Sequence, residues 1–177
     1  LIPVWDLAQS NGHTTTQTET KKEDTKEEDK GSNKSNGTEK APNTAVTVFI
    51  YLMNEVNEMT EETGAAFIGN FMAESGGNTY NLDPAISEYS GGGGYGLVQW
   101  TYYTRKDPLI AKPNHDTLKV QCEYIKEELD GKYHGAVTTA NSKSTIAERA
   151  RVVADMYEQP LESLRDLRGE PAQRFYD

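Results

Sequence analysis

Residues 10–42 consist almost entirely of polar and charged residues, with Thr, Lys, Glu, Asp, Ser and Gly predominating. They contain no Val, Leu, Ile, Met or aromatic residue, so they show no apolar periodicity. Such a segment cannot bury enough apolar surface to offset the conformational entropy that ordering would cost. We therefore expect a disordered polar tether with an end-to-end distance of about 30 Å, by the scaling of flexible linkers.

The composition changes at Asn43, and residues 43–177 have enough Leu, Ile, Val, Tyr and Phe for one hydrophobic core. Residues 1–9, which include Trp5, form a short apolar plug. The plug is too small to fold alone, so we expect it to dock on a larger assembly or on the domain. The predicted organisation is a plug and tether over 1–42 and a folded domain over 43–177. Because the chain begins with Leu1, we expect a processed chain or a fragment.

Charge and composition exclude several classes of function. The formal charge is −10, and residues 43–177 hold 12 Lys and Arg against 20 Asp and Glu. An acidic domain is a poor match for nucleic acid, which binds basic patches, or for anionic lipid. No stretch reaches the roughly 20 apolar residues of a membrane span. A single cysteine excludes an internal disulfide, and the three histidines lack ligand spacing, so we expect no metal and no cofactor.

Apolar spacing predicts a mostly α-helical domain. A first helix is expected over about 43–57, where apolar residues recur every three or four positions. The residues that define this pattern are Val46, Phe49, Ile50, Met53 and Val56. A second helix is expected over 61–74, following Thr60 as a cap and ending at Ser75-Gly76-Gly77. The side chains that it should bury are Ala65, Phe67, Ile68, Phe71 and Met72.

Seven glycines and a proline between residues 76 and 96 interrupt the helical pattern. We expect turns there, with or without a short hairpin, forming one wall of a cleft before Leu97, Val98 and Trp100 return to the core. A further helix is expected over 116–130, capped by Asp116. The residues expected on one face of that helix are Leu118, Cys122, Ile125 and Leu129.

Two more helices complete the expected domain. One begins at Ser144 or Thr145, where Thr145 and Glu148 fit a capping box, and ends before Pro160. A last short helix is expected over 170–176.

Glu74 ends the second expected helix, beside Met72 and Ala73, and the chain turns immediately afterwards. A carboxyl group among apolar side chains is desolvated, which disfavours its charged form. A general acid needs this property because it has to carry a proton near neutral pH. Glu74 is therefore a candidate general acid at a cleft, and a solvated glutamate at a helix end is the alternative.

Residues 69–78 (GNFMAESGGN) and 94–101 (GYGLVQWT) together resemble the phage tail lysozyme family of the lysozyme-like superfamily. The residues that match the family pattern are Gly69, Asn70, Met72, Glu74, Ser75, Asn78, Gly96, Leu97, Gln99, Trp100, Thr101 and Arg105. Tyr157-Glu158-Gln159-Pro160 is similar to the family's aromatic-Glu-x-Pro motif. The resemblance covers about 45–177, and it departs from the pattern after Asn78, where the usual proline is absent.

The resemblance implies an α+β lysozyme-like fold and cleavage of the β-1,4 bond between N-acetylmuramic acid and N-acetylglucosamine in peptidoglycan. It places Glu74 on the catalytic acid, and Tyr95 and Gln99 on the loop that lines the sugar cleft. It also implies attachment to a larger phage tail or cell-surface assembly, which residues 1–9 would contact. The expected location is the tail tip of a virion, or the outside of a cell at its wall.

A glycosidase generally uses a second carboxylate, and the candidates are Asp83 and Glu88. Asp83 precedes Pro84 and can equally be a helix cap, whereas Glu88 can equally be solvated surface. A lytic transglycosylase needs no second acid, because one Glu protonates the leaving oxygen and then takes a proton from the sugar's own hydroxyl. These mechanisms stay open, as does a non-catalytic wall-binding or structural tail module.

Aromatic residues surround the expected cleft, and such rings stack on sugars. Ser87, Tyr89, Tyr95, Gln99 and Trp100 are the candidate substrate-binding residues, although Trp100 beside Val98 also fits the core. Arg105 can contact a muramyl peptide or pair with an acid of the domain. Cys122 and His134 are not interpreted as a peptidase site, because Cys122 lies on an apolar helix face and a catalytic thiol needs an electropositive setting.

Overall fold

The computed structural model describes residues 43–87, 93–160 and 162–177. The tether, the plug, Glu88 and Tyr89 lie outside these residues. Among the described residues the helices are α2 (Thr44–Glu55), α3 (Glu61–Ser75), α4 (Tyr103–Ile110), α5 (Leu118–Asp130), α6 (His134–Asn141), α7 (Ile146–Val153), the π-helix η1 (Ala154–Glu158), the 3-10 helix η2 (Glu162–Arg168) and α8 (Gly169–Tyr176). The expected mostly helical fold is confirmed. The described segments contain isolated bridges and no regular strand.

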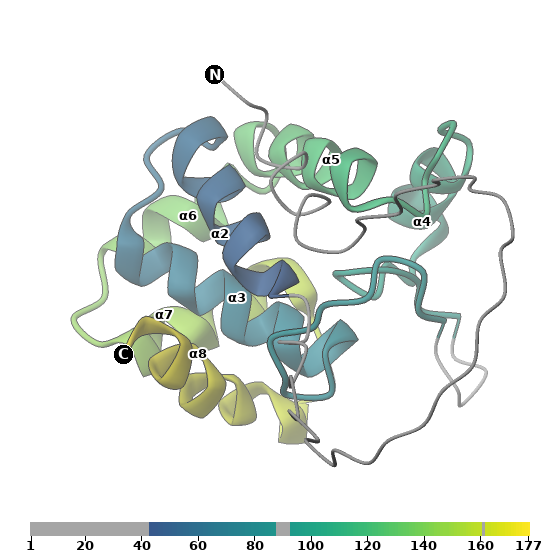
Figure 1. Cartoon of the computed structure of the whole chain (residues 1–177). Coiled ribbons are helices and arrows are strands. Elements are labelled where there is room, and N and C mark those ends of the chain that lie inside the picture. The colour runs from purple at the N-terminus through teal and green to yellow at the C-terminus, as the bar shows by residue number, and fades with distance from the viewer. Residues whose placement is uncertain (1–42, 88–92, 161) are drawn as a thin grey trace, which may run out of the picture.

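Helix α3 runs through the middle of the domain and packs against α2, α6, α7, η2 and α8 (Figure 1). Thr60 caps it as expected, because its side chain accepts a hydrogen bond from the Thr63 backbone N–H. The five apolar residues predicted to be buried are all fully buried. The position of α3 explains why its sequence is apolar or small on nearly every side: it has neighbours all round rather than one face in water.

Helix α2 forms as predicted, but its buried face differs from the predicted one. Ala45, Val48 and Leu52 are fully buried, whereas Val46 and Ile50 are 40% and 38% exposed. The apolar residues of α2 cover most of its circumference, so spacing alone identifies the helix without selecting the face that packs inward.

The cap of α7 is the predicted one, and the cap of α5 is not. The Thr145–Glu148 capping box is present at the start of α7. Helix α5 is capped by Thr117, whose side chain accepts from the Val120 backbone N–H, and not by Asp116. Helices α4 and α6 have no counterpart among the expected helices. Each is only 8 residues long, and α4 contains Pro108, so neither shows a clear helical pattern.

Two motif residues of α3 bind the helices together. The Asn70 side-chain amide donates to the Ala66 carbonyl of its own helix at 2.9 Å and to the Ala150 carbonyl of α7 at 3.1 Å. At Gly69, an added Cβ would lie 2.5 Å from the Ala172 Cβ, so α8 packs directly on the α3 backbone. Because α8 follows η2 without a break, this close approach also fixes the end of η2.

The glycine-rich segment returns toward the end of α3 (Figure 1). The Asp83 N–H donates to the Ser75 carbonyl at 3.1 Å, and the Gly96 N–H donates to the Ile86 carbonyl at 2.9 Å. Gly96 has φ +75° and leaves no room for a Cβ, which would lie 2.6 Å from Gln121 Oε1. Leu97, Val98 and Trp100 are buried, as predicted.

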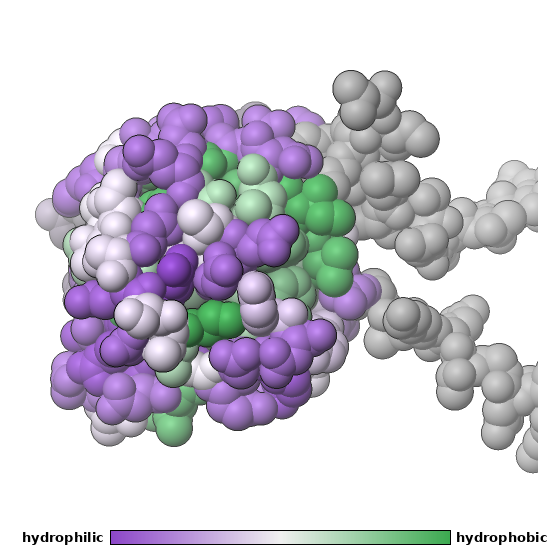
Figure 2. Space-filling model, turned by 90° about the vertical axis from the view of Figure 1, so that its left-hand side faces the viewer, coloured by the Kyte–Doolittle hydropathy of each residue, from purple (hydrophilic) through white to green (hydrophobic). Residues whose placement is uncertain are grey.

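On the face shown in Figure 2, hydrophilic residues predominate and hydrophobic ones lie in smaller areas between them. None of the helices in the described segments has the length and apolar character that crossing a bilayer would require.

We predict that Gly69→Ala destabilises the domain by about 1–3 kcal/mol, the usual cost of overpacking, because the methyl group would collide with α8. Gly135→Ala is the matched control, since its added Cβ meets Met156 Cε at 3.5 Å, an ordinary contact. Urea denaturation followed by circular dichroism measures both variants. Equal stability of the two variants would contradict the close packing of α3 and α8.

Candidate functional site

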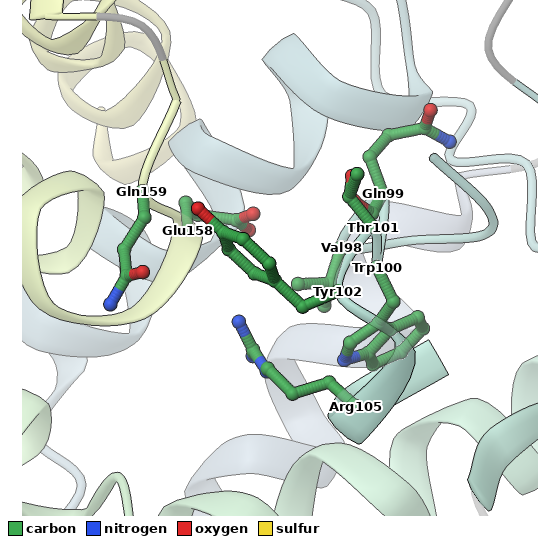
Figure 3. A pocket seen from close by; sticks show the side chains of 8 residues that line it. All are labelled: Val98, Gln99, Trp100, Thr101, Tyr102, Arg105, Glu158 and Gln159. Atoms are coloured by element: carbon green, nitrogen blue, oxygen red, sulfur yellow. The ribbon is translucent and has the colours of Figure 1, made fainter. Parts of the chain in front are cut away.

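A pocket of about 170 Å³ lies between the segment 98–102, the start of α4 and the end of η1. Its lining residues are Val98, Gln99, Trp100, Thr101, Tyr102, Arg105, Glu158 and Gln159. Figure 3 shows Arg105 and the Glu158 carboxyl group approaching from different elements, with the Tyr102 ring beside them. The pocket therefore unites the second half of the sequence motif with the Tyr157-Glu158-Gln159-Pro160 stretch.

A buried ion pair between Arg105 and Glu128 supports the pocket. The Arg105 Nε donates to Glu128 Oε2 at 2.7 Å, and its Nη2 donates to Oε1 at 3.0 Å. Trp100 Nε1 and the Tyr157 hydroxyl also donate to Glu128 Oε1, at 2.9 and 2.8 Å. The two charged side chains are only 9% and 7% exposed. A buried charge needs such partners, because desolvation without them is costly.

The Arg105 guanidinium also fixes the end of η1. Its Nη1 donates to the Tyr157 carbonyl at 2.8 Å, and its Cζ lies 4.4 and 4.8 Å from the ring centroids of Tyr133 and Tyr157. Burial alone would lower the pKa of Arg105, but the hydrogen bond to Glu128 and the surrounding charges raise it above its usual value, so the cation persists. Arg105 thus positions the residue that follows Tyr157, which is Glu158.

Glu158 has a buried carboxyl group. Neither of its oxygens has a hydrogen-bond partner among the described residues, although the residue as a whole is half-buried. Burial raises the pKa of Glu158 well above its usual value, and the negative charge of Glu74 raises it further. Arg105 and Arg168 oppose this shift without cancelling it. Burial therefore favours the neutral form of Glu158 more than it would be favoured in an exposed glutamate.

Glu74 lies in the last turn of α3 with its side chain 17% exposed. Its Oε1 accepts a hydrogen bond at 2.5 Å from Nη2 of Arg168, the last residue of η2, whose side chain is 8% exposed. The sequence neighbours of Glu74 indicate an apolar setting for its carboxyl group. The structure instead places a guanidinium against that group. A guanidinium at this distance favours the carboxylate. Sequence reasoning missed Arg168, because no local pattern connects residues 94 positions apart.

Glu74, Asp83 and Ser87 are not among the residues that line the pocket. Asp83 is exposed, and its Oδ1 accepts from the Ala85 N–H at 2.9 Å, which makes a turn rather than a helix cap. Glu88, like Tyr89, lies outside the described residues. Ser87 is exposed and pairs with Tyr95 in an isolated bridge.

Gln99 and Tyr95 shape the loop. The Gln99 side-chain amide donates to the Ile86 carbonyl at 3.2 Å and to the Gly96 carbonyl at 3.0 Å, while the residue also lines the pocket. Tyr95 is half-buried, its ring lies 5.7 Å from that of His115, and burial is the main cause that raises its pKa. Gln99 is thus brought to the pocket, whereas Tyr95 is not among the residues that line it.

Trp100, Arg105 and Cys122 have structural positions. Trp100 is 1% exposed, which agrees with the core interpretation and leaves no ring face for stacking on a sugar. Arg105 pairs with an acid of the domain, which is one of its two expected alternatives. Cys122 is buried, and burial raises the pKa of its thiol above the usual value, as suits a packing residue.

Two comparisons with known proteins bear on this geometry. A family model described as phage tail lysozyme matches residues 43–177. A search of curated proteins finds no match. The matched range contains every residue of the pocket and of the Glu74–Arg168 pair.

We predict that Glu128→Gln destabilises the domain by about 3–5 kcal/mol, the usual cost of breaking a buried ion pair by removing one partner. The variant leaves the Arg105 cation buried beside a neutral amide. Glu127→Gln is the matched control, because Glu127 is 68% exposed and lies 3.6 Å from Lys112, so a change below about 1 kcal/mol is expected. Chemical denaturation of both variants measures the difference, and similar values would contradict the supporting role of the pair.

Proposed function

The chain belongs to the phage tail lysozyme family, and on that premise we propose that it cleaves the β-1,4 bond between N-acetylmuramic acid and N-acetylglucosamine with Glu74 as general acid. Membership of the family indicates a lysozyme-like, peptidoglycan-degrading function. The specific bond and the role of Glu74 go beyond that indication and are our proposal.

The observation that carries this proposal is the contrast between two carboxyl groups in different environments, of which Glu74 acts electrostatically on Glu158. Glu74 is the more accessible one and is held by Arg168, whereas Glu158 has buried oxygens and favours its neutral form. Pairs of acids whose environments separate their protonation behaviour are typical of glycosidase sites. As general acid, Glu74 would protonate the leaving glycosidic oxygen while the bond from that oxygen to the sugar C1 breaks.

Arg168 is placed to stabilise the carboxylate that proton transfer leaves on Glu74. When Glu74 gives up its proton it becomes a carboxylate, and a charge-assisted hydrogen bond from a buried guanidinium stabilises this form. The same contact orients the carboxyl group, since both side chains are held at the ends of fixed helices. Precise orientation of a proton donor is itself a large part of catalysis.

The fate of the sugar C1 distinguishes a hydrolase from a lytic transglycosylase. In a hydrolase, water adds to C1; in a transglycosylase, the sugar's own hydroxyl closes an anhydro ring and gives its proton to Glu74. The transglycosylase is the second candidate, because it needs no second carboxylate, and Asp83 is an exposed residue that makes a backbone turn through one oxygen.

We further propose that the protein acts at a phage tail tip, with residues 1–9 contacting the assembly; a cell-surface location is the alternative. Anionic wall polymers would repel this acidic domain. Attachment to an assembly already bound at the wall would supply the high local concentration that diffusion does not.

We predict that Glu74→Gln lowers the release of muropeptides from purified peptidoglycan by at least about 100-fold, the usual contribution of a general acid. Glu61→Gln, an exposed change at the opposite end of α3, is the control and should retain activity. Mass spectrometry of the fragments adds the mechanism, since reducing ends indicate hydrolysis and anhydro ends indicate transglycosylation. Full activity of Glu74→Gln would reject its role, and an inactive wild-type protein would favour the non-catalytic module.

A further inference from the structure

The Glu158 carboxyl group lies at the pocket without a hydrogen bond from the protein. Both of its oxygens are buried, and neither has a hydrogen-bond partner among the described residues, although Glu158 lines the pocket (Figure 3). Buried acceptors are satisfied in most native proteins, because an unmade hydrogen bond leaves their desolvation uncompensated. Packing therefore does not account for this carboxyl group, whereas a ligand that donates hydrogen bonds to it would.

The hydrogen-bond donors on the buried side of the pocket are already in use. Arg105 donates through Nε and Nη2 to Glu128 and through Nη1 to the Tyr157 carbonyl, so all three nitrogens of its guanidinium are engaged. Trp100 donates its Nε1 proton to Glu128 as well. The pocket therefore offers a ligand an unmatched acceptor rather than an unmatched donor.

The charges that face Glu158 are already paired with one another. They belong to Glu74, Arg105, Glu128 and Arg168. Arg105 bonds directly to Glu128, and Arg168 bonds directly to Glu74. Glu158 is left without a counter-ion among the described residues. A cation in the pocket would supply one, and its charge would favour the carboxylate form of Glu158, which passes its proton to solvent.

The size of the pocket limits what can enter it. Its volume of about 170 Å³ is below the roughly 300–1,000 Å³ of sites that enclose a whole small molecule. The pocket is suited to one functional group of a larger ligand, with the remainder of that ligand outside. Thr101, Tyr102 and Gln159 line the pocket and are exposed, so they form its rim.

Tyr102 supplies an aromatic ring at this rim. It is 59% exposed, and Figure 3 shows its ring beside the Glu158 carboxyl group. Exposed side chains change rotamer rapidly, so movement of this ring can admit a group to the buried oxygens. An aromatic face and a carboxylate together suit an ammonium ion, through cation–π attraction and charge-assisted hydrogen bonds.

We propose that the pocket is a binding subsite for a primary ammonium group of peptidoglycan, held by the Glu158 carboxylate and the Tyr102 ring. The inference rests on the proposed function for the source of that group. A wall can present it on the side chain of a diamino acid in a stem peptide or on a sugar that lacks its acetyl group. In a stem peptide, cross-linking converts the amine into an uncharged amide, so the subsite would select strands that are not cross-linked.

NMR titration of the full chain at pH 7 tests the ligand with two matched pairs of probes. One pair is a muramyl tripeptide that ends in L-lysine and the same tripeptide acetylated on the lysine Nζ. The other is the disaccharide of glucosamine and that of N-acetylglucosamine. In one pair the amine should bind at least about tenfold more tightly than its acetylated form and shift the backbone signals of Thr101, Tyr102 and Gln159. That pair identifies the source, and no preference for the amine in either pair would overturn the proposal.

The variant Glu158→Gln tests the carboxyl group. It keeps the shape of the side chain without the charge, and should weaken binding of the preferred amine at least about tenfold. Asp107→Asn is the control, because it removes an equal charge from an exposed position of α4 outside the pocket lining, and it should bind as wild type does. Urea denaturation shows whether the variants are folded, and wild-type affinity in folded Glu158→Gln would overturn the proposal.

The variant Tyr102→Ala tests the site from an exposed position that the core does not depend on. We expect affinity for the amine to fall about threefold or more, within the range of a cation–π contact. Tyr103→Ala is the matched control, because Tyr103 is 76% exposed and is not among the lining residues. Equal affinity of the two tyrosine variants would contradict the role of the ring.

Activity separates this inference from the proposed function. Muropeptide release is measured on peptidoglycan before and after acetylation of its free amines. If the wild type binds the amine at the pocket but releases no muropeptides, the proposed function fails and the ammonium subsite stands. If it degrades both preparations equally and shows no preference for an amine in the titration, the inference alone fails.

Discussion

The ion pair between Arg105 and Glu128 is the constraint on which the pocket depends. Glu128 accepts from Arg105, Trp100 and Tyr157, which come from three different parts of the chain. Because these groups are buried, any of them left without its hydrogen-bond partner would destabilise the fold by its uncompensated desolvation. One carboxylate thereby fixes the loop after the glycine-rich segment, the start of α4 and the end of η1 relative to α5.

A second constraint acts from the other side of the site. Gly69 brings α8 onto the α3 backbone, and α8 continues directly from η2, so the position of Arg168 follows from a helix contact made elsewhere. Glu74 belongs to α3 itself. The two carboxyl groups and the guanidinium therefore sit on parts of the scaffold that are each fixed by packing, which is what a site needs if its groups are to stay aligned.

The sequence predicts the elements of the fold better than it predicts its long-range polar contacts. Helix α3 was predicted because a buried helix has a strong apolar signal, and Glu74 was selected because it ends that helix. Pairing between Glu74 and Arg168 has no such signal, since it arises only when η2 folds back. The family motif also mixes roles: Trp100 and Arg105 match it, yet the structure gives both of them a supporting position.

The Glu158 carboxyl group is the feature that packing alone does not explain. A buried acid with no hydrogen-bond partner among the described residues lowers stability at neutral pH, and a neutral amide of the same shape would avoid that loss. Arg105 holds the backbone next to this residue through the Tyr157 carbonyl, so the fold directs the carboxyl group inward rather than letting it reach water. A local rule broken at such a cost is characteristic of a functional position, and Glu158 lines the pocket.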